Sequence, residues 1–351
     1  KRRMTLALRP YQIAAIEAVY EHLRSRDDNP VIEIPTAGGK SAIIAQICSD
    51  AVTLWGGRVV ITAHVKELLE QNAGELVALD PDLAIPTSKV GIYSAGLGEK
   101  NPDLPITVAG IQSAFRKPEA FGKVDLVLVD EAHLIPPEGE GMYRTFLAAL
   151  KEKNPLLRVI GLTATPYRMS TGLISAPENI LNRICYSAGV LDLMRQGYLC
   201  KLVGKSVVEP DTSDLHIRGG EFVADEAQAL MTRSGVVEAA CADLHRLAEG
   251  RKSVLVFCTG VEHAQAVAKE LNRLNNWGAV TLFGDTPADE RAETIALFKE
   301  GVVRYLVNVN VLTTGFNAPN VDCVAMLRPT MSPGLYYQMV GRGFRLSPGK
   351  A

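Results

Sequence analysis

The sequence predicts an α/β protein with two units, each built on a parallel sheet, and three observations support this prediction. The chain has 351 residues, which is more than one hydrophobic core usually organises, so two domains of ordinary size are expected. Short runs rich in Val, Ile and Leu alternate with helical patterns, as they do in strand–helix–strand units. The alternation stops near the middle of the chain and then resumes, which indicates one unit on each side of the break.

The first unit contains five predicted strands and a crossover helix. Each strand is a short apolar run without alternation, which is typical of a strand buried on both faces. The runs lie at 31–34, 59–63, 106–109, 124–129 and 159–162. Between the first two runs, residues 41–52 carry apolar side chains at helical spacing and predict a helix.

The second unit repeats this pattern after a break that is rich in Gly, Pro, Ser and Asn, as linkers are. Its predicted strands lie at 253–258, 279–283, 305–308 and 323–327. A polar stretch at 211–220 is expected to be a loop, with helices following it as far as residue 249. We therefore predict a first domain at 1–168, a linker at 169–186 and a second domain at 187–351.

The composition is that of an ordinary globular protein. Hydrophobic residues make up 47% and charged residues 22% of the chain, and no apolar window is long enough to span a membrane. No signal peptide is evident, so a cytoplasmic location is expected, with no membrane partner. The six cysteines include no Cys-x-x-Cys pair, which indicates neither a zinc site nor a disulfide framework. A formal charge of −2 neither favours nor excludes nucleic acid as a partner.

A segment of small residues between a predicted strand and a predicted helix indicates phosphate binding. It reads Pro35-Thr36-Ala37-Gly38-Gly39-Lys40-Ser41. Small residues let backbone N–H groups surround phosphates, and the N-terminus of a helix adds positive potential. Lys40 is expected to contact the β and γ phosphates of ATP and Ser41 to bind Mg²⁺. Taken alone, the same residues would also fit an ordinary turn at the start of a helix.

An acidic pair follows the strand predicted at 124–129. Asp130 and Glu131 emerge at its carboxyl end, where open α/β sheets bind their ligands. Asp130 is expected to hold Mg²⁺, and Glu131 to orient or deprotonate the attacking water. Taken alone, Asp130 could instead be the N-cap of an acidic helix turn. The two motifs together predict binding and hydrolysis of Mg-ATP.

Five motifs in this order resemble those of superfamily 2 helicases of the DEAD/DEAH-box type. They are Leu8-Arg9-Pro10-Tyr11-Gln12, the segment from Pro35 to Ser41, Asp130-Glu131-Ala132-His133, Thr163-Ala164-Thr165-Pro166 and the segment from Gln338 to Arg345. The resemblance spans nearly the whole chain and implies two tandem RecA-like domains with an ATP cleft between them. Within the superfamily, the segments at 64–68, 161–166, 196–199 and 311–316, with Gly341-Arg342-Gly343, are similar to RadD-type bacterial DNA-repair helicases.

The resemblance implies further residues at the nucleotide. Those that would contact ATP outside the phosphate segment are Arg9, Gln12, Gly315 and Asn317. Those that would couple nucleotide state to domain closure are His133, Thr163 and Thr165. Those that would join Lys40, Asp130 and Glu131 in catalysis are Gln338, Arg342 and Arg345, the two arginines as arginine fingers.

Two positions depart from the family pattern. Ala37 stands where relatives commonly have Gly, and a positive φ at this position would strain an alanine; we expect a tolerated variant. Asn317 stands where many relatives have Asp, which removes a charge but keeps an acceptor oxygen.

The resemblance also implies a nucleic-acid track across both domains. Its residues are Thr62, His64, Lys66, Gln112, Ser113, Thr259, Thr286, Thr313 and Thr314. Hydroxyl, amide and backbone groups of this kind contact phosphates without reading sequence. Neither His64 nor His133 has metal-ligand spacing around it, so each also fits a structural hydrogen-bonding role.

The sequence therefore predicts a nucleic-acid-dependent ATPase or helicase that translocates on or remodels DNA. Single-stranded or branched DNA is the favoured partner, together with proteins of DNA repair or recombination. An RNA helicase or the motor subunit of a restriction complex would share these motifs. The non-enzyme alternative is a nucleotide-gated nucleic-acid-binding module, which the presence of Glu131 and Arg342 disfavours.

Overall fold

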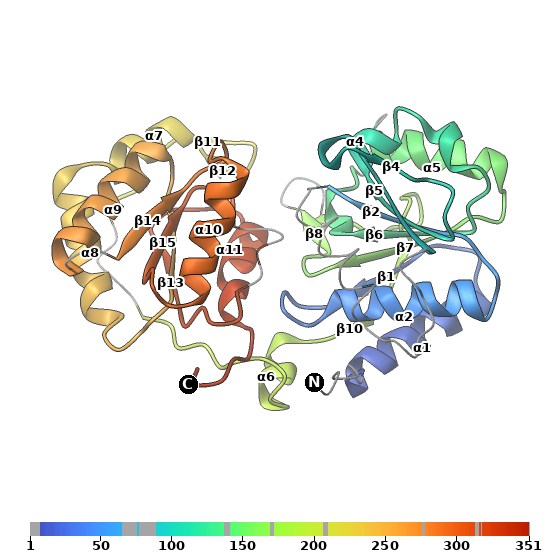
Figure 1. Cartoon of the computed structure of the whole chain (residues 1–351), viewed down its shortest axis with the longest axis horizontal. Helices are drawn as coiled ribbons and strands as arrows, with labels where there is room; N and C mark the ends of the chain where they lie inside the picture. Colours follow the sequence, from blue (N-terminus) through green and yellow to red (C-terminus); the bar gives the residue numbers. More distant parts are fainter. Residues whose placement is uncertain are drawn as a thin grey trace. The chain divides into compact units, whose positions relative to one another are not determined.

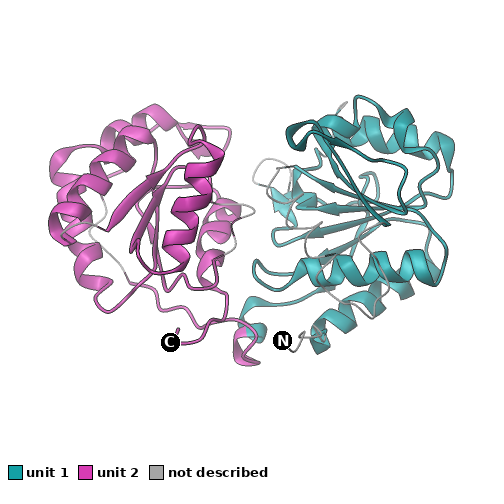
Figure 2. Cartoon of the chain, viewed as in Figure 1, with its two compact units in different colours: residues 1–193 teal, residues 194–351 magenta. Residues whose placement is uncertain are grey.

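The computed structural model describes residues 8–64, 76, 89–136, 141–168, 172–205, 210–275, 278–312, 316 and 318–350. The chain divides into two compact units, Lys1–Leu193 and Met194–Ala351 (Figure 2). Each unit contains a parallel sheet with helices on both faces, which confirms the predicted α/β class (Figure 1). Within the described ranges, no helix has the length and apolar character needed to cross a membrane.

The first unit is built on an eight-stranded sheet with the order β10-β1-β7-β6-β2-β5-β3-β4. Its strands are β1 (Pro30–Glu33), β2 (Val59–Ala63), β3 (Val90–Ser94), β4 (Glu99–Lys100), β5 (Ile106–Gly110), β6 (Leu126–Asp130), β7 (Arg158–Thr163) and β10 (Arg183–Ser187). All neighbours pair in parallel except β3 and β4. Every residue of β2, β5 and β6 is buried, as expected for strands covered on both faces.

Helices cover both faces of this sheet. They are α1 (Pro10–Ser25), α2 (Lys40–Thr53), α4 (Ile111–Ala114) and α5 (Met142–Lys153), followed by α6 (Val190–Arg195). Figure 1 shows α1 and α2 on one side and α4 and α5 on the other. Phe146 and Leu150 of α5 pack in one cluster with Val127 and Val129 of β6. Short 3-10 turns at η2 (Ala95–Leu97), η3 (Pro118–Phe121) and η4 (Ala132–Leu134) and a hairpin of β8 (Tyr167–Arg168) and β9 (Gly172–Leu173) complete the unit.

The boundary between the units differs from the predicted one. Residues 183–186, expected within the linker, form β10 together with Ser187, and β10 pairs in parallel with β1. The side chains of β10 are only half-buried or exposed, because it is an edge strand. An edge strand needs no continuous apolar run, so the sequence pattern does not mark it.

The second unit is built on a four-stranded parallel sheet with the order β14-β15-β13-β16. Its strands are β13 (Val254–Phe257), β14 (Ala279–Leu282), β15 (Tyr305–Asn308) and β16 (Cys323–Met326), all at predicted positions. Its helices are α7 (Ala224–Met231), α8 (Ser234–Leu247), α9 (Val261–Asn275), α10 (Ala288–Lys299) and α11 (Pro333–Val340), with the 3-10 turn η5 (Gly341–Gly343). The expected loop at 211–220 instead enters a hairpin of β11 (Ile217–Arg218) and β12 (Glu221–Phe222).

Alternate residues of β13 pack into two different hydrophobic clusters, one on each face of the sheet. Val254 and Val256 pack with apolar residues of α8 and α9. Leu255 and Phe257 pack with a cluster that includes Phe298 of α10 and residues near α11. Because successive side chains of a strand point to opposite faces, one short apolar run fills both layers.

Candidate active site

The strand order of the first sheet brings three predicted motifs together. Strand β7 lies between β1 and β6, and all three run in the same direction. The segment after β1, Thr163 at the end of β7 and Asp130 at the end of β6 therefore lie at one edge of the sheet. This is the edge at which open α/β sheets bind ligands.

The segment from Pro35 to Ser41 forms a tight loop that leads into α2. The N–H of Gly38 donates to the carbonyl of Pro35 over 2.8 Å, and a Cβ at position 38 would lie 2.6 Å from the side chain of Ile34. Ala37 has a φ of 67° and Gly39 a φ of 76°. Only glycine adopts this left-handed region without steric cost, so Ala37 is strained as the sequence indicated.

Tyr11 and Gln12 hold this loop from outside it. The hydroxyl of Tyr11 donates to the carbonyl of Gly38 over 2.7 Å. The amide nitrogen of Gln12 donates to the carbonyls of Gly38 and Gly39 over 3.3 and 3.2 Å, and its amide oxygen accepts the N–H of Arg9. Tyr11, whose role the sequence did not predict, thus anchors the phosphate loop.

The acidic pair faces the lysine of the loop. Lys40 Nζ lies 3.4 Å from Glu131 Oε1. Asp130 is 4% exposed, and its Oδ1 accepts the N–H of Glu131 over 3.0 Å. The backbone of Glu131 is left-handed with a φ of 52°, a conformation that persists in a non-glycine residue only when its surroundings hold it.

His133, Thr163 and Thr165 form one hydrogen-bonded chain beside this pair. His133 Nδ1 lies 3.0 Å from Thr163 Oγ1 and 3.4 Å from Glu131 Oε2. Thr163 Oγ1 also accepts the N–H of Thr165 over 3.0 Å. Burial lowers the pKa of His133 and outweighs the opposing effect of Glu131, so the imidazole is neutral at neutral pH.

His64 follows the last residue of β2, and Tyr143 lies in the first turn of α5. Their rings stack with centroids 6.2 Å apart. Burial lowers the pKa of His64. It also raises the pKa of Tyr143, and Asp130 and Glu131 add to that rise. The sequence did not identify Tyr143 as a residue that interacts with the acidic pair.

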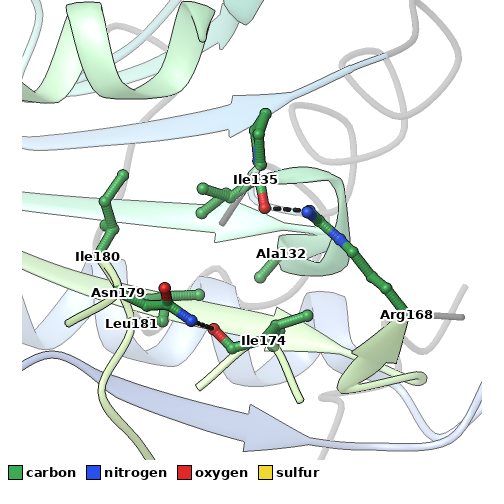
Figure 3. Close-up of a pocket in the computed structure, with 8 residues that line it drawn as sticks. Ala132, Ile135, Arg168, Ile174, Asn179, Ile180 and Leu181 are labelled. Atoms are coloured by element: carbon green, nitrogen blue, oxygen red, sulfur yellow. Dashed lines mark hydrogen bonds between the residues drawn. The ribbon is translucent and has the colours of Figure 1, made fainter. Parts of the chain in front are cut away.

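Arg168 contacts the turn after the acidic pair. Its Nε donates to the carbonyl of His133 over 2.5 Å, and its guanidinium also donates to the carbonyl of Ile135. Figure 3 shows the latter contact at the side of a small hollow that Ala132 and Ile174 also line. Sequence reasoning missed Arg168, and its only signal was its place two residues after Pro166.

The second unit holds its predicted residues through separate contacts. Arg342 Nη1 donates to the carbonyl of Phe316 over 2.8 Å. The carbonyl of Arg345 accepts from Lys350 Nζ over 2.7 Å and from the thiol of Cys200 over 3.1 Å. Gln338 lies on α11, which leads into η5 and Arg342.

The predicted track residues are placed unequally. Thr62 is fully buried, and its hydroxyl donates to the carbonyl of Leu128, so it packs the sheet. Gln112 is exposed, and Ser113 Oγ accepts the N–H of Ala95. The remaining described residues, in the second unit, are Thr259, which contacts the imidazole of His263, and Thr286, whose hydroxyl accepts the N–H of Phe283. The predicted site residues that lie outside the described ranges are Lys66, Thr313, Thr314, Gly315 and Asn317.

Two family models match the chain. One, described as the type III restriction enzyme Res subunit, matches residues 5–168, and one described as the helicase conserved C-terminal domain matches residues 237–347. A protein of Saccharomyces cerevisiae provisionally named ATP-dependent helicase Irc3 is 29% identical over 98% of this chain and 50% of its own length. The chain spans about half the length of the curated Irc3 relatives that it matches.

Solved structures share the fold. A fragment of a provisionally assigned HsdR subunit of a type I restriction enzyme from Vibrio vulnificus matches with a TM-score of 0.70 and 20% identity, over 97% of this chain and 62% of that one. The ATP-dependent type ISP restriction-modification enzyme LlaBIII, solved bound to DNA, matches with a TM-score of 0.68 and 16% identity, over 98% of this chain and 27% of that one.

These relatives are of the Irc3 and restriction types, so the narrower resemblance to RadD-type helicases stays a prediction. The broader assignment rests on the two family matches, on two parallel-sheet units of the RecA-like kind, and on a phosphate loop facing an acidic pair. The chain therefore matches both domains of the superfamily 2 helicase core, and members of that superfamily are ATP hydrolases.

Proposed function

We propose that this chain hydrolyses Mg-ATP at the edge of its first sheet and uses the cycle to translocate on or remodel DNA. The observation that carries the proposal is the pairing of Lys40 with Glu131 across 3.4 Å. It joins a phosphate-binding lysine to a carboxylate that can orient water, at the edge where ligands bind.

The donor set fits magnesium. Mg²⁺ is commonly held by one or two carboxylates, a hydroxyl and substrate phosphates, and it keeps several waters. Asp130 supplies a buried carboxylate at the end of β6, and Ser41 supplies a hydroxyl in the first turn of α2. When bound, the ion would neutralise phosphate charge. Asp130 and Ser41 would hold it, and Lys40 would contact the β and γ phosphates.

Arg342 and Arg345 have a proposed role of a different kind. A guanidinium stabilises charge that develops on a transferring phosphoryl group and matches its planar geometry better than an ammonium does. Both arginines belong to the second unit, whereas the phosphate loop and the acidic pair belong to the first. We propose that hydrolysis depends on closure of the two units, and that a bound strand favours closure.

DNA is the first polymer to test. One relative of this fold is described as bound to DNA, and the RadD-type resemblance points to DNA repair. The experiment measures ATP turnover with single-stranded DNA, duplex DNA, forked DNA, RNA and no polymer. We expect DNA to raise turnover by ~10-fold or more, because closure assembles the catalytic groups.

Each other outcome excludes part of the proposal. Stimulation by RNA alone would assign the chain to RNA, the main rival substrate. Turnover that ignores every polymer would refute the motor role, and binding of DNA without any turnover would favour a nucleotide-gated binding module. Equal stimulation by forked and linear DNA would remove the support for a branched repair substrate.

A further inference from the structure

Arg168 caps the backbone turn that follows the acidic pair. Its Nε donates to the carbonyl of His133 over 2.5 Å, and its second guanidinium nitrogen donates to the carbonyl of Ile135 (Figure 3). These carbonyls lie within and just after η4, the 3-10 turn from Ala132 to Leu134. The last carbonyls of such a turn have no partner within it, so Arg168 satisfies groups that would otherwise need water.

The same short segment holds the acidic turn at a second point. Thr163, five residues before Arg168, contacts the ring of His133 through its hydroxyl. Thr165 N–H is bonded to that hydroxyl, which ties the intervening backbone to it. The segment 163–168 therefore grips His133 from two directions, at its side chain through Thr163 and at its carbonyl through Arg168.

The turn requires such support. Glu131 has left-handed backbone geometry with a φ of 52°, which costs a residue with a Cβ about 1 kcal/mol or more. The carbonyl of Glu131 accepts the N–H of Leu134, and the carbonyl of Ala132 accepts that of Ile135. These two hydrogen bonds connect the turn to the backbone of Glu131. A change in the contacts of the His133 and Ile135 carbonyls would therefore alter the backbone conformation of Glu131.

We propose that Arg168 is a positioning residue for Glu131, and that it transmits displacement of the segment 163–168 to the carboxylate that orients water. The inference rests on the proposed hydrolysis at this site. It extends coupling beyond the hydroxyls of Thr163 and Thr165 to a guanidinium outside the recognised motifs. Arg168 touches neither ATP nor water in this role; it acts through the turn.

A lysine cannot replace this arginine fully. The planar guanidinium presents several N–H groups in a fixed fork and can bridge two carbonyls at once. An ammonium at the same place keeps the charge but has no fixed fork. The change Arg168→Lys therefore tests geometry with little change in charge, and Arg168→Met removes the donors while keeping an unbranched stem.

Arg158 provides a matched control in the same sheet. It begins β7, whose other end carries Thr163, and its Nη2 donates to the carbonyls of Arg26 and Asp28 over 2.7 and 2.8 Å. It is thus another partly buried arginine that bridges two backbone carbonyls, but at the end of the strand away from the acidic pair. Arg158→Lys should lower the free energy of unfolding about as much as Arg168→Lys does, without changing the position of Glu131.

The test compares kcat, KM for ATP and amide hydrogen exchange in the purified chain and its variants, with and without polymer. We expect Arg168→Lys to lower kcat by ~10-fold and Arg168→Met by more, with KM changed less than ~3-fold, because misplacing a catalytic group mainly affects the chemical step. Exchange at the amides of Leu134 and Ile135 should accelerate. Arg158→Lys should leave kcat within ~2-fold of the unmodified chain and leave these two amides unchanged.

Three results would overturn the inference: an unchanged kcat in Arg168→Lys, an equal fall in Arg158→Lys, or unchanged exchange in the turn. If exchange is faster while kcat is unchanged, the first of these results, Arg168 holds the turn without controlling hydrolysis. If the unmodified chain hydrolyses no ATP, the proposed function fails, whereas the exchange measurement still decides whether Arg168 holds the turn.

Discussion

In the first unit, segments far apart in the sequence meet in one network around the phosphate loop, whereas in the second unit the described candidate residues make separate contacts. Gln12 bonds Gly39 and Lys40 pairs with Glu131, across 27 and 91 residues respectively. In contrast, Thr259 contacts His263 and Thr286 contacts Phe283. The comparison indicates a phosphate site assembled within the first unit and, in the second unit, candidate residues that make separate contacts. Changes in the first should therefore affect both binding and turnover, and changes in the second mainly turnover.

The largest expected effect follows from Lys40→Ala. The change removes the cation that faces Glu131 and the expected phosphates, so ATP turnover should fall by ~1,000-fold or more, with weaker ATP binding. Lys153→Ala is the matched control, since Lys153 also belongs to the first unit but donates to carbonyls in η3. Turnover by the Lys40 variant close to that of the unmodified chain would refute the assignment of the site.

A smaller effect is expected from Arg342→Lys in the second unit. The ammonium keeps the charge but loses the fork, so kcat should fall by ~100-fold while the Kd for ATP changes less than ~3-fold. Arg304→Lys is the control, because Arg304 is anchored by the carbonyls of Arg251 and Ala248 and by Asn275. Loss of ATP binding in the Arg342 variant would remove the distinction between the two units.

The sequence predicted the nine strands that carry apolar runs, because burial on both faces leaves a run that is visible without a structure. It missed β3 and β10 for physical reasons. Strand β3 contains Gly91, where a Cβ would collide with the backbone of Asn101. Only glycine fits this position, and because glycine is rare in strands, the sequence pattern there does not indicate a strand. Strand β10 lies at a sheet edge and buries little.

Within the site, sequence motifs identified the expected phosphate-binding and catalytic residues but not the residues that hold the backbone around them. Lys40, Asp130 and Glu131 were recognisable because their residue types and spacing match phosphate and metal chemistry. The anchoring roles of Tyr11 and Arg168 were not, since each donates to backbone carbonyls, and a carbonyl leaves no mark in the sequence. The left-handed φ of Ala37 is an intermediate case. The departure of Ala37 from the family pattern suggested that a positive φ was possible there, and the structure shows one.

Acid should destabilise the second unit through His263. Its Nδ1 accepts the N–H of Thr259 and lies 2.8 Å from the hydroxyl, and burial lowers the pKa of His263 to about 4. An unfolded histidine titrates near 6.5, so the unfolded chain takes up the proton first as the pH falls. The free energy of unfolding therefore keeps its full value above about pH 6.5 and decreases as the pH falls toward 4, by a total on the order of 3 kcal/mol.

Urea unfolding between pH 7 and pH 4 measures this effect. The change His263→Gln should flatten the pH dependence of the free energy of unfolding, because an amide does not titrate in that range. His216→Gln is the control, since His216 is exposed and pairs with Glu226 at the surface. A steep pH dependence that survives in the His263 variant would place the acid-sensitive group elsewhere.

The smallest effect tests the strain in the phosphate loop. Left-handed geometry costs an alanine about 1–2 kcal/mol, whereas a glycine costs about 0.4–1 kcal/mol through the greater freedom of the unfolded chain. Ala37→Gly should therefore raise the free energy of unfolding of the first unit by about 0.5 kcal/mol. Ala42→Gly, inside α2, should lower it by about 1 kcal/mol, because glycine is a poor helix former. If both changes destabilise the unit equally, the loop holds Ala37 without net strain, and the network around the first-unit site is less demanding than its backbone angles imply.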